Sequence, residues 1–162
     1  MTGTQTVGDD YVSLVLAQLG DDAGEAQRAE RLALADQQQR VRELSPIEMP
    51  ALPAVLGRRS ETDVTVAAQA GDRDVLEALG RYRADVTRRE SENAGRLRRC
   101  LWLLGVFRSD GSDYADRLEQ WIRGRFRVPA GIELPTDPVG RRQCAGPLTR
   151  DYAILPRAWR QL

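Results

Sequence analysis

The pattern of apolar and polar positions predicts a chain of helices interrupted by two proline-containing segments. The clearest helical period runs over residues 74–107, where apolar side chains recur three or four positions apart. They are Val75, Leu79, Tyr82, Val86, Leu97, Cys100, Leu101 and Leu104. A polar stretch over residues 88–93, followed by Gly95, interrupts this stripe. The period therefore fits either one helix of about 34 residues, about 50 Å long, whose middle crosses solvent, or two helices that meet at a kink.

Shorter helices are predicted before this region. Residues 10–19 form an apolar segment that stops at Gly20, and residues 22–44 read as a polar helix. Its apolar stripe is too thin to hold a globular core, which favours packing against another helix or chain. Residues 1–9 are predicted to be a flexible lead.

Two sequence signals mark helix ends between residues 60 and 79. Ser60 stands three residues before Asp63, a capping-box spacing that predicts a helix start. The run from Val66 to Leu79 contains Ala-Gly-Asp and resembles the turn of many helical hairpins. This resemblance predicts a helix-turn-helix geometry in which one helix ends at Gly71 and Asp72 caps the next.

A further helix is predicted to open at Asp113, after the turn at residues 109–111. Its apolar face is expected to comprise Tyr114, Leu118, Trp121, Ile122 and Phe126.

Two proline-containing segments break the helical pattern. Residues 45–57 hold Pro46, Pro50 and Pro53 and are otherwise largely apolar, which favours an extended strap over the protein's own core rather than docking into a partner groove. Prolines and glycines after Val128 leave no room for a full helix, and residues 129–162 are expected to form an extended arm. The arm keeps large apolar residues, so it should dock on its own domain or on a neighbour. The candidate partner-binding anchors are Tyr152, Ile154, Leu155 and Trp159.

The expected fold is therefore all-α, a small bundle of about five helices with a proline-rich strap and an extended C-terminal arm. The chain divides into a lead (1–9), N-terminal helices and strap (10–57), a helical core (58–128) and the arm (129–162).

Composition limits the chemistry of the chain. All 24 basic residues are arginine, because the sequence contains neither lysine nor histidine. Without histidine, the chain has no side chain whose ordinary pKa suits general base catalysis near neutral pH, and it cannot supply a Ser-His-Asp or Cys-His site. Without lysine, it cannot form a Schiff base or supply the lysine of a nucleotide-binding loop.

Charge is divided unevenly along the chain. Residues 1–80 carry 14 acidic side chains against 7 arginines, a balance of −7, and residues 81–162 carry the opposite balance of +7. Arginines alternate with aromatic residues in the last predicted helix, an arrangement suited to phosphate contact and base stacking. The candidate nucleic-acid-binding residues are Arg117, Arg123, Arg125 and Arg127.

Carboxylates and thiols are weaker candidates. Asp110, Asp113 and Asp116 are spaced to hold a divalent cation, but residues of this type at a helix start more commonly cap it. Cys100 lies in an apolar run and is predicted to be buried and inert. Cys144 follows two arginines that would lower the pKa of its thiol.

These features predict a non-catalytic adaptor or small structural subunit of a larger assembly, with one or more protein partners and neither cofactor nor metal. The arm and the helix faces are the expected docking elements, and removal of the arm after Val128 should abolish the complex while leaving most helix intact. An arginine-rich nucleic-acid-binding protein is the alternative, and a carboxylate-dependent enzyme the third interpretation. The sequence has no signal peptide and no apolar run of membrane-spanning length, so a cytoplasmic location without membrane contact is expected.

Overall fold

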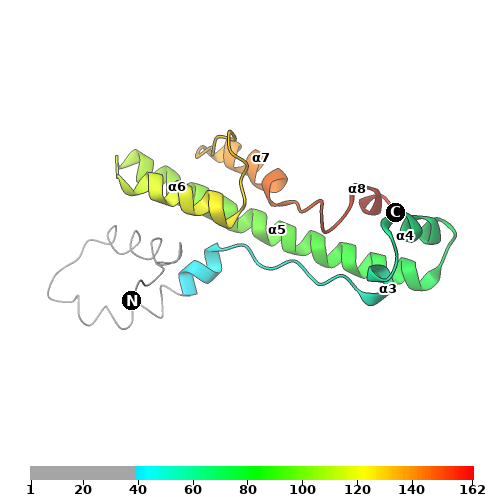
Figure 1. The fold of residues 1–162 in the computed structure, drawn as a ribbon. Helices are drawn as coiled ribbons and strands as arrows, with labels where there is room; N and C mark the ends of the chain where they lie inside the picture. The colour runs from blue at the N-terminus through cyan, green and yellow to red at the C-terminus, as the bar shows by residue number, and fades with distance from the viewer. Residues whose placement is uncertain (1–38) are drawn as a thin grey trace. The chain divides into compact units, whose positions relative to one another are not determined.

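The computed structural model describes residues 39–162, and the elements predicted for residues 1–38 lie outside this range. The described chain is helical and contains no strand, which confirms the all-α prediction (Figure 1). Residues 39–44 form the first described helical turn. The other helices are α3 (Ala54–Gly57), α4 (Glu61–Gln69), α5 (Arg73–Ser109), α6 (Tyr114–Arg125), α7 (Pro138–Thr149) and α8 (Arg157–Arg160).

The described residues fall into two compact units, each made of two separate stretches of chain. Unit 1 contains residues 39–46 and 94–148, and unit 2 contains residues 47–93 and 149–162. Helix α5 contributes its first half to unit 2 and its second half to unit 1.

Helix α5 settles the alternative that the sequence left open, because it is one helix of 37 residues. The polar middle of this helix is not fully exposed to solvent. Glu90 and Asn93 are both buried within unit 2. The side-chain oxygen of Asn93 accepts a hydrogen bond from the Ile47 amide at 2.7 Å, and its amide nitrogen donates to the Ile47 carbonyl at 3.2 Å. The polar residues thus hold neighbouring backbone onto the helix, where an apolar side chain would leave these groups unpaired.

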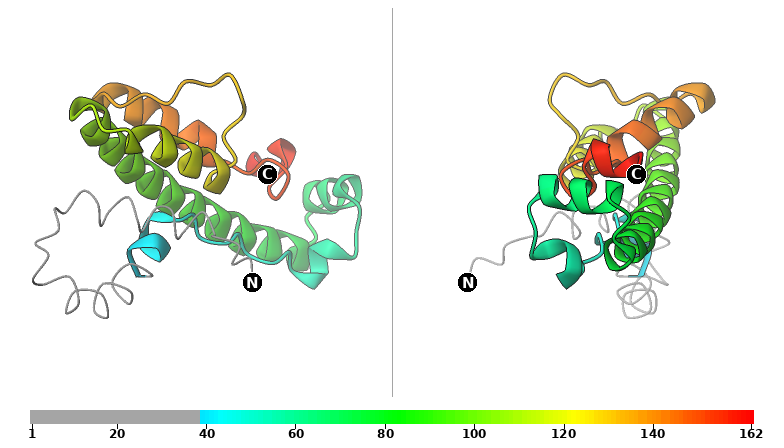
Figure 2. Two further views of the ribbon diagram at one scale, coloured as in Figure 1. Left: turned by 60° about the vertical axis from the view of Figure 1, so that its left-hand side comes forward. Right: turned by 90° about the vertical axis from the view of Figure 1, so that its right-hand side faces the viewer.

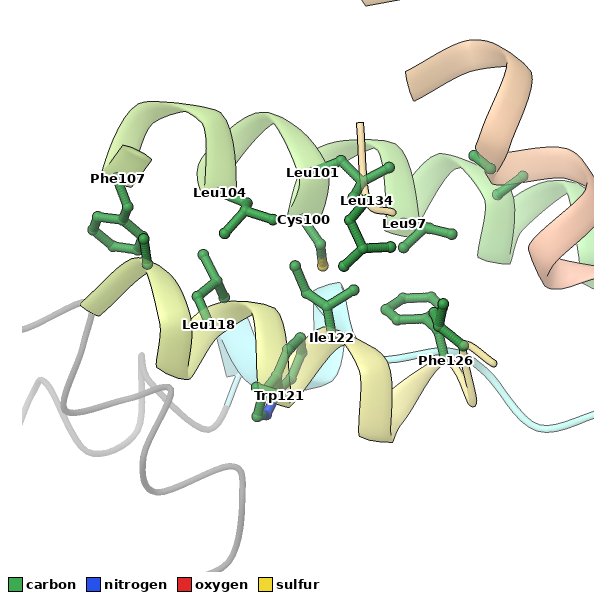
Figure 3. Packing of buried hydrophobic residues seen from close by; sticks show 14 residues of the cluster. Leu97, Cys100, Leu101, Leu104, Phe107, Leu118, Trp121, Ile122, Phe126 and Leu134 are labelled. Carbon is green, nitrogen blue, oxygen red and sulfur yellow. The ribbon is translucent and has the colours of Figure 1, made fainter. Parts of the chain in front are cut away.

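The core of unit 1 lies between α5 and α6. Figure 3 shows the α5 stripe of Leu97, Cys100, Leu101, Leu104 and Phe107 facing α6. The α6 side chains of this core are Leu118, Trp121, Ile122 and Phe126, and Leu134 and Ala145 complete it from the following chain. The apolar faces predicted for both helices are therefore the faces that they bury.

The core of unit 2 joins the first half of α5 to α4 and to the C-terminal segment. Val75, Leu79, Tyr82 and Val86 supply the α5 stripe. Leu56, Val64, Ala68, Leu155 and Trp159 pack against it. Tyr82 adds a polar contact, since its hydroxyl donates to the carbonyl of Ile154 at 3.1 Å.

The strap lies on the protein's own cores. Leu44, just before it, packs against the core of unit 1, and Met49 packs against that of unit 2. The last four residues, predicted to be extended, form helix α3 and place Leu56 fully within the core of unit 2. Its path beside α5 is seen in Figure 2. The guanidinium of Arg89 donates to the Glu48 carbonyl at 2.7 Å, so α5 also supplies hydrogen-bond donors to this extended backbone.

One feature of the predicted arm is corrected by the structure. Residues 138–149 form the regular helix α7, although Pro147 lies inside it. Proline was expected to prevent a full helix here. Pro138 occupies the first position of α7, where the missing amide hydrogen costs nothing, and Pro147 forgoes one backbone hydrogen bond near the end of the helix. The arm is thus non-helical only in the stretch before α7, in the stretch between α7 and α8, and in its last two residues.

The start of α4 follows the predicted capping box. The Ser60 hydroxyl accepts a hydrogen bond from the Asp63 amide at 3.1 Å. Gly71 has φ of 82°, and the Asp72 carboxylate accepts from the Val75 amide at 3.4 Å. The predicted helix-turn-helix is therefore present at these residues.

Substitution Ser60→Ala is expected to lower the free energy of unfolding by about 1 kcal/mol, because the Asp63 amide loses its acceptor. Urea denaturation followed by far-ultraviolet circular dichroism measures this difference. Ser60→Asp, which keeps an acceptor at the cap, should remain near the wild-type value. An equal loss in both variants would contradict a capping role for Ser60.

No helix within residues 39–162 combines the length and apolar character needed to cross a membrane.

Candidate binding site

The predicted anchors of the arm are mostly used by the protein's own core. Leu155 and Trp159 are buried in unit 2, and Ile154 packs against the same cluster. Only Tyr152 is well exposed, at 46%. Its ring lies under Arg160 and Arg157, with guanidinium-to-centroid distances of 5.2 and 5.7 Å. Of the four residues predicted to bind a partner, Tyr152 is therefore the one that a partner can reach without opening the core.

The arginines predicted to contact nucleic acid lie on or just after α6, but the aromatic residues between them are not available. Trp121 and Phe126 are buried in the core of unit 1. Arg123 lies 3.7 Å from the Glu119 carboxylate, and Arg125 lies over the Trp121 ring at 5.8 Å. Arg117 stacks over Tyr114, and Arg127 is exposed at the end of the helix, with φ of 50°. The aromatic residues between these arginines are therefore buried, and the partly exposed Tyr114 ring lies under Arg117.

The predicted carboxylate group does not form a cation site. Among the described residues, no three acidic, cysteine or histidine side chains lie close enough to hold a metal ion. Asp113 is the N-cap residue of α6, but its side chain accepts no capping bond. Instead the Ser112 hydroxyl accepts from the Tyr114 amide at 3.2 Å. The carboxylates therefore mark the helix start, and Ser112 performs the side-chain capping.

The two cysteines differ from each other in burial but not in the direction of their pKa shifts. Cys100 is fully buried, and burial raises the pKa of its thiol to about 12, which confirms the predicted inert thiol. Burial also raises the pKa of Cys144 on α7. This corrects the expectation that neighbouring arginines lower it. Both thiols are free and protonated at neutral pH.

A hollow that was not predicted lies on the surface of unit 1 between α5 and α7. It has a volume of about 400 Å³ and is open to solvent. Figure 2 shows α7 alongside the part of α5 that borders it. We call it the Trp102 hollow, and its lining consists of Gly95, Arg98, Arg99, Trp102, Pro138, Arg141 and Arg142.

The composition of the Trp102 hollow is unusual for this protein. It holds four arginines and no acidic residue, and none of the four makes an ion pair with a carboxylate in the described part of the chain. Trp102 is 56% exposed, whereas Trp121 and Trp159 are buried at 1% and 4%. The hollow therefore combines four arginines that form no ion pair among the described residues with the one solvent-accessible indole of the chain. Asp110 and Asp137 line the adjoining hollow, which shares Trp102 and Arg141.

Close backbone packing fixes the α7 side of the hollow. A Cβ at Gly140 would lie 2.5 Å from Asp137 Oδ1 and 2.6 Å from Pro135 Cβ, so only glycine fits. The Gly140 amide donates to the Asp137 carboxylate at 2.8 Å, which caps α7. In the same turn the Arg141 guanidinium donates to the Thr136 carbonyl at 2.7 Å, and this bond orients its side chain beside Trp102.

The sequence carried a signal for this hollow. Residues 95, 98, 99 and 102 are spaced three or four apart, so they share one face of α5. That face is displaced from the apolar stripe of Leu97, Cys100, Leu101 and Leu104, which predicts that Trp102 points away from the core. The contribution of α7 had no such signal, because Arg141 and Arg142 fall in a segment expected to be extended.

Comparison of the chain with protein-family models, with curated proteins and with solved structures finds no match. The structure shows an all-α protein whose unit 1 carries an arginine-lined surface hollow beside an exposed tryptophan.

Proposed function

We propose that this protein is a non-catalytic adaptor or small structural subunit that binds an anionic partner at the Trp102 hollow. The observation that carries the proposal is the exposed indole of Trp102 among four arginines without carboxylate partners in the described chain. Tryptophan and arginine are the residues most enriched among those that dominate binding energy at interfaces.

The remaining chemistry of the chain also favours binding over catalysis. Lysine and histidine are missing from the whole sequence. Burial raises the pKa of both thiols, so neither is a ready nucleophile at neutral pH. Arginine remains protonated throughout the physiological range and serves as a charged donor rather than a proton carrier.

The folded arm changes how docking is expected to occur. Because Leu155 and Trp159 stabilise unit 2, the arm is not free to serve as a detachable connector. The docking role therefore passes from the arm to a surface built on α5 and α7, where cations and an aromatic face are already exposed.

A tagged full-length chain, used as bait in lysate of the native host with and without nuclease, tests this function. We expect a partner in fixed ratio to the bait, identified as protein if it survives nuclease and as nucleic acid if it does not. The variant Trp102→Ala should lose that partner while keeping its helix content.

The matched control is Arg117→Gln with Arg125→Gln, which removes two exposed charges from α6 and leaves the hollow intact. This double variant should retain the partner. Recovery of the same partner by Trp102→Ala, or the lack of any partner that depends on the hollow, would overturn the proposed function.

A further inference from the structure

We infer that the Trp102 hollow binds single-stranded nucleic acid, with a base stacked on the Trp102 indole and the backbone phosphates held by the arginines of α5 and α7. This inference rests on the proposed function, since it names the partner that the hollow takes.

The aromatic surface of the hollow suits a base better than a peptide anchor. Apart from Trp102, the lining offers only Gly95 and Pro138 as apolar residues. It therefore lacks the aliphatic pocket that would hold a leucine or isoleucine side chain of a docking peptide. Stacking of a base requires only an accessible aromatic face, and the indole of Trp102 provides one.

The four cations are placed to follow a phosphate backbone. Arg98 and Arg99 come from α5, and Arg141 and Arg142 come from α7 across the hollow. A nucleic-acid strand carries one negative charge per nucleotide, and the planar guanidinium donates two parallel hydrogen bonds to a phosphate. The Arg98 guanidinium lies near Gly95, where a Cβ would be 3.8 Å from its Nη2, and both residues line the hollow together with Trp102.

The nucleic acid is expected to be single-stranded, because stacking on Trp102 needs a base whose face is not covered by a neighbouring base. In a duplex each base is already stacked on its neighbours, and extruding one from the helix requires unstacking energy. An acidic peptide would also pair with the arginines, but its carboxylates do not stack on an indole as the face of a base does. The exposed tryptophan therefore favours nucleic acid over peptide.

Fluorescence anisotropy of a dye-labelled 12-nucleotide oligothymidylate, titrated with the full-length chain, tests the inference and measures affinity in every variant. In the wild-type chain, binding should also quench tryptophan fluorescence, because Trp102 is exposed while Trp121 and Trp159 are buried. We expect Trp102→Ala to weaken binding by roughly 5- to 150-fold, the range found for loss of one base–aromatic stack, and Trp102→Phe to recover part of it. The slope of log affinity against log salt should be about −2.8 for four phosphate contacts.

Two charge variants locate the site. Arg98→Gln with Arg142→Gln should reduce the salt slope to about −1.4, because two phosphate contacts remain. Arg117→Gln with Arg125→Gln removes the same charge from α6 and should leave both affinity and quenching unchanged.

Four results would overturn the inference: equal affinity for a duplex of the same length, equal affinity for polyglutamate, loss of binding in the α6 pair instead, or no oligonucleotide binding. Its failure is distinguishable from that of the proposed function. If the wild-type chain retains a Trp102-dependent partner after nuclease treatment, the inference of single-stranded nucleic acid is wrong and the adaptor function stands. If the wild-type chain captures no partner whose binding depends on Trp102, both the inference and the proposed function are wrong.

Discussion

Removal of residues 129–162 is expected to unfold the chain rather than to release a docking arm. The truncation takes Leu134 and Ala145 out of the core of unit 1, and Leu155 and Trp159 out of that of unit 2. Truncation of one large buried side chain typically costs 2–5 kcal/mol, so the combined loss is on the order of 10 kcal/mol, comparable to the whole stability of a small domain.

Circular dichroism and thiol labelling together measure this outcome. The truncated chain should lose helix content and show no cooperative thermal transition. Cys100, whose pKa is raised to about 12 by burial, should become reactive at pH 8, since an exposed thiol returns to its ordinary pKa.

The control is the full-length Tyr152→Ala variant, which changes an exposed residue of the same segment and should stay within about 0.5 kcal/mol of wild type. A truncated chain that keeps wild-type helix content and a cooperative transition would show that the arm is a detachable element after all.

Substitution Glu90→Ala is expected to destabilise unit 2 by about 3 kcal/mol. The Glu90 side chain is only 8% exposed, and its carboxylate accepts from Arg160 Nη2 at 2.6 Å and Nη1 at 3.2 Å. It also accepts from the Asp151 amide at 3.2 Å. Removal of the carboxylate leaves a largely buried guanidinium and a backbone amide without their acceptor, and such uncompensated groups cost more than the pair itself contributes.

Denaturant unfolding with two comparison variants separates burial from charge. Glu77→Ala breaks an exposed pair with Arg81 at 4.0 Å and should change stability by less than about 0.5 kcal/mol. The double variant Glu90→Leu with Arg160→Met should recover part of the lost stability, because an apolar pair replaces the buried ionic one while the Asp151 amide still lacks its acceptor. If Glu90→Ala behaves like Glu77→Ala, the ion pair does not hold the C-terminal segment.

Local sequence signals predicted the helices that depend on short-range interactions. The capping box at Ser60, the turn at Gly71 and the apolar stripes of α5 and α6 all act within a few residues, so their spacing is readable from the chain. The same reasoning missed α7. The prolines of this segment argued against a helix, although Pro138 stands at the first position of α7, where proline is tolerated.

Only the α5 side of the candidate site could be predicted from the sequence. The face of α5 that carries Arg98, Arg99 and Trp102 follows from helical spacing, but its partner face on α7 depends on contacts that are distant in sequence. The α6 arginines were the more conspicuous candidates because aromatic residues alternate with them. Packing then placed Trp121 and Phe126 in the core, where neither is accessible to a base.

The sequence by itself determined an all-α chain without lysine or histidine, because helical period, capping residues and composition are local or additive properties. Tertiary structure alone decided which apolar residues remained at the surface. Leu155 and Trp159 are as apolar as Trp102, and only long-range packing distinguishes residues that fill a core from one that remains at the surface. Burial is a property of the assembled cores, so it cannot be assigned to a residue before its distant neighbours are known.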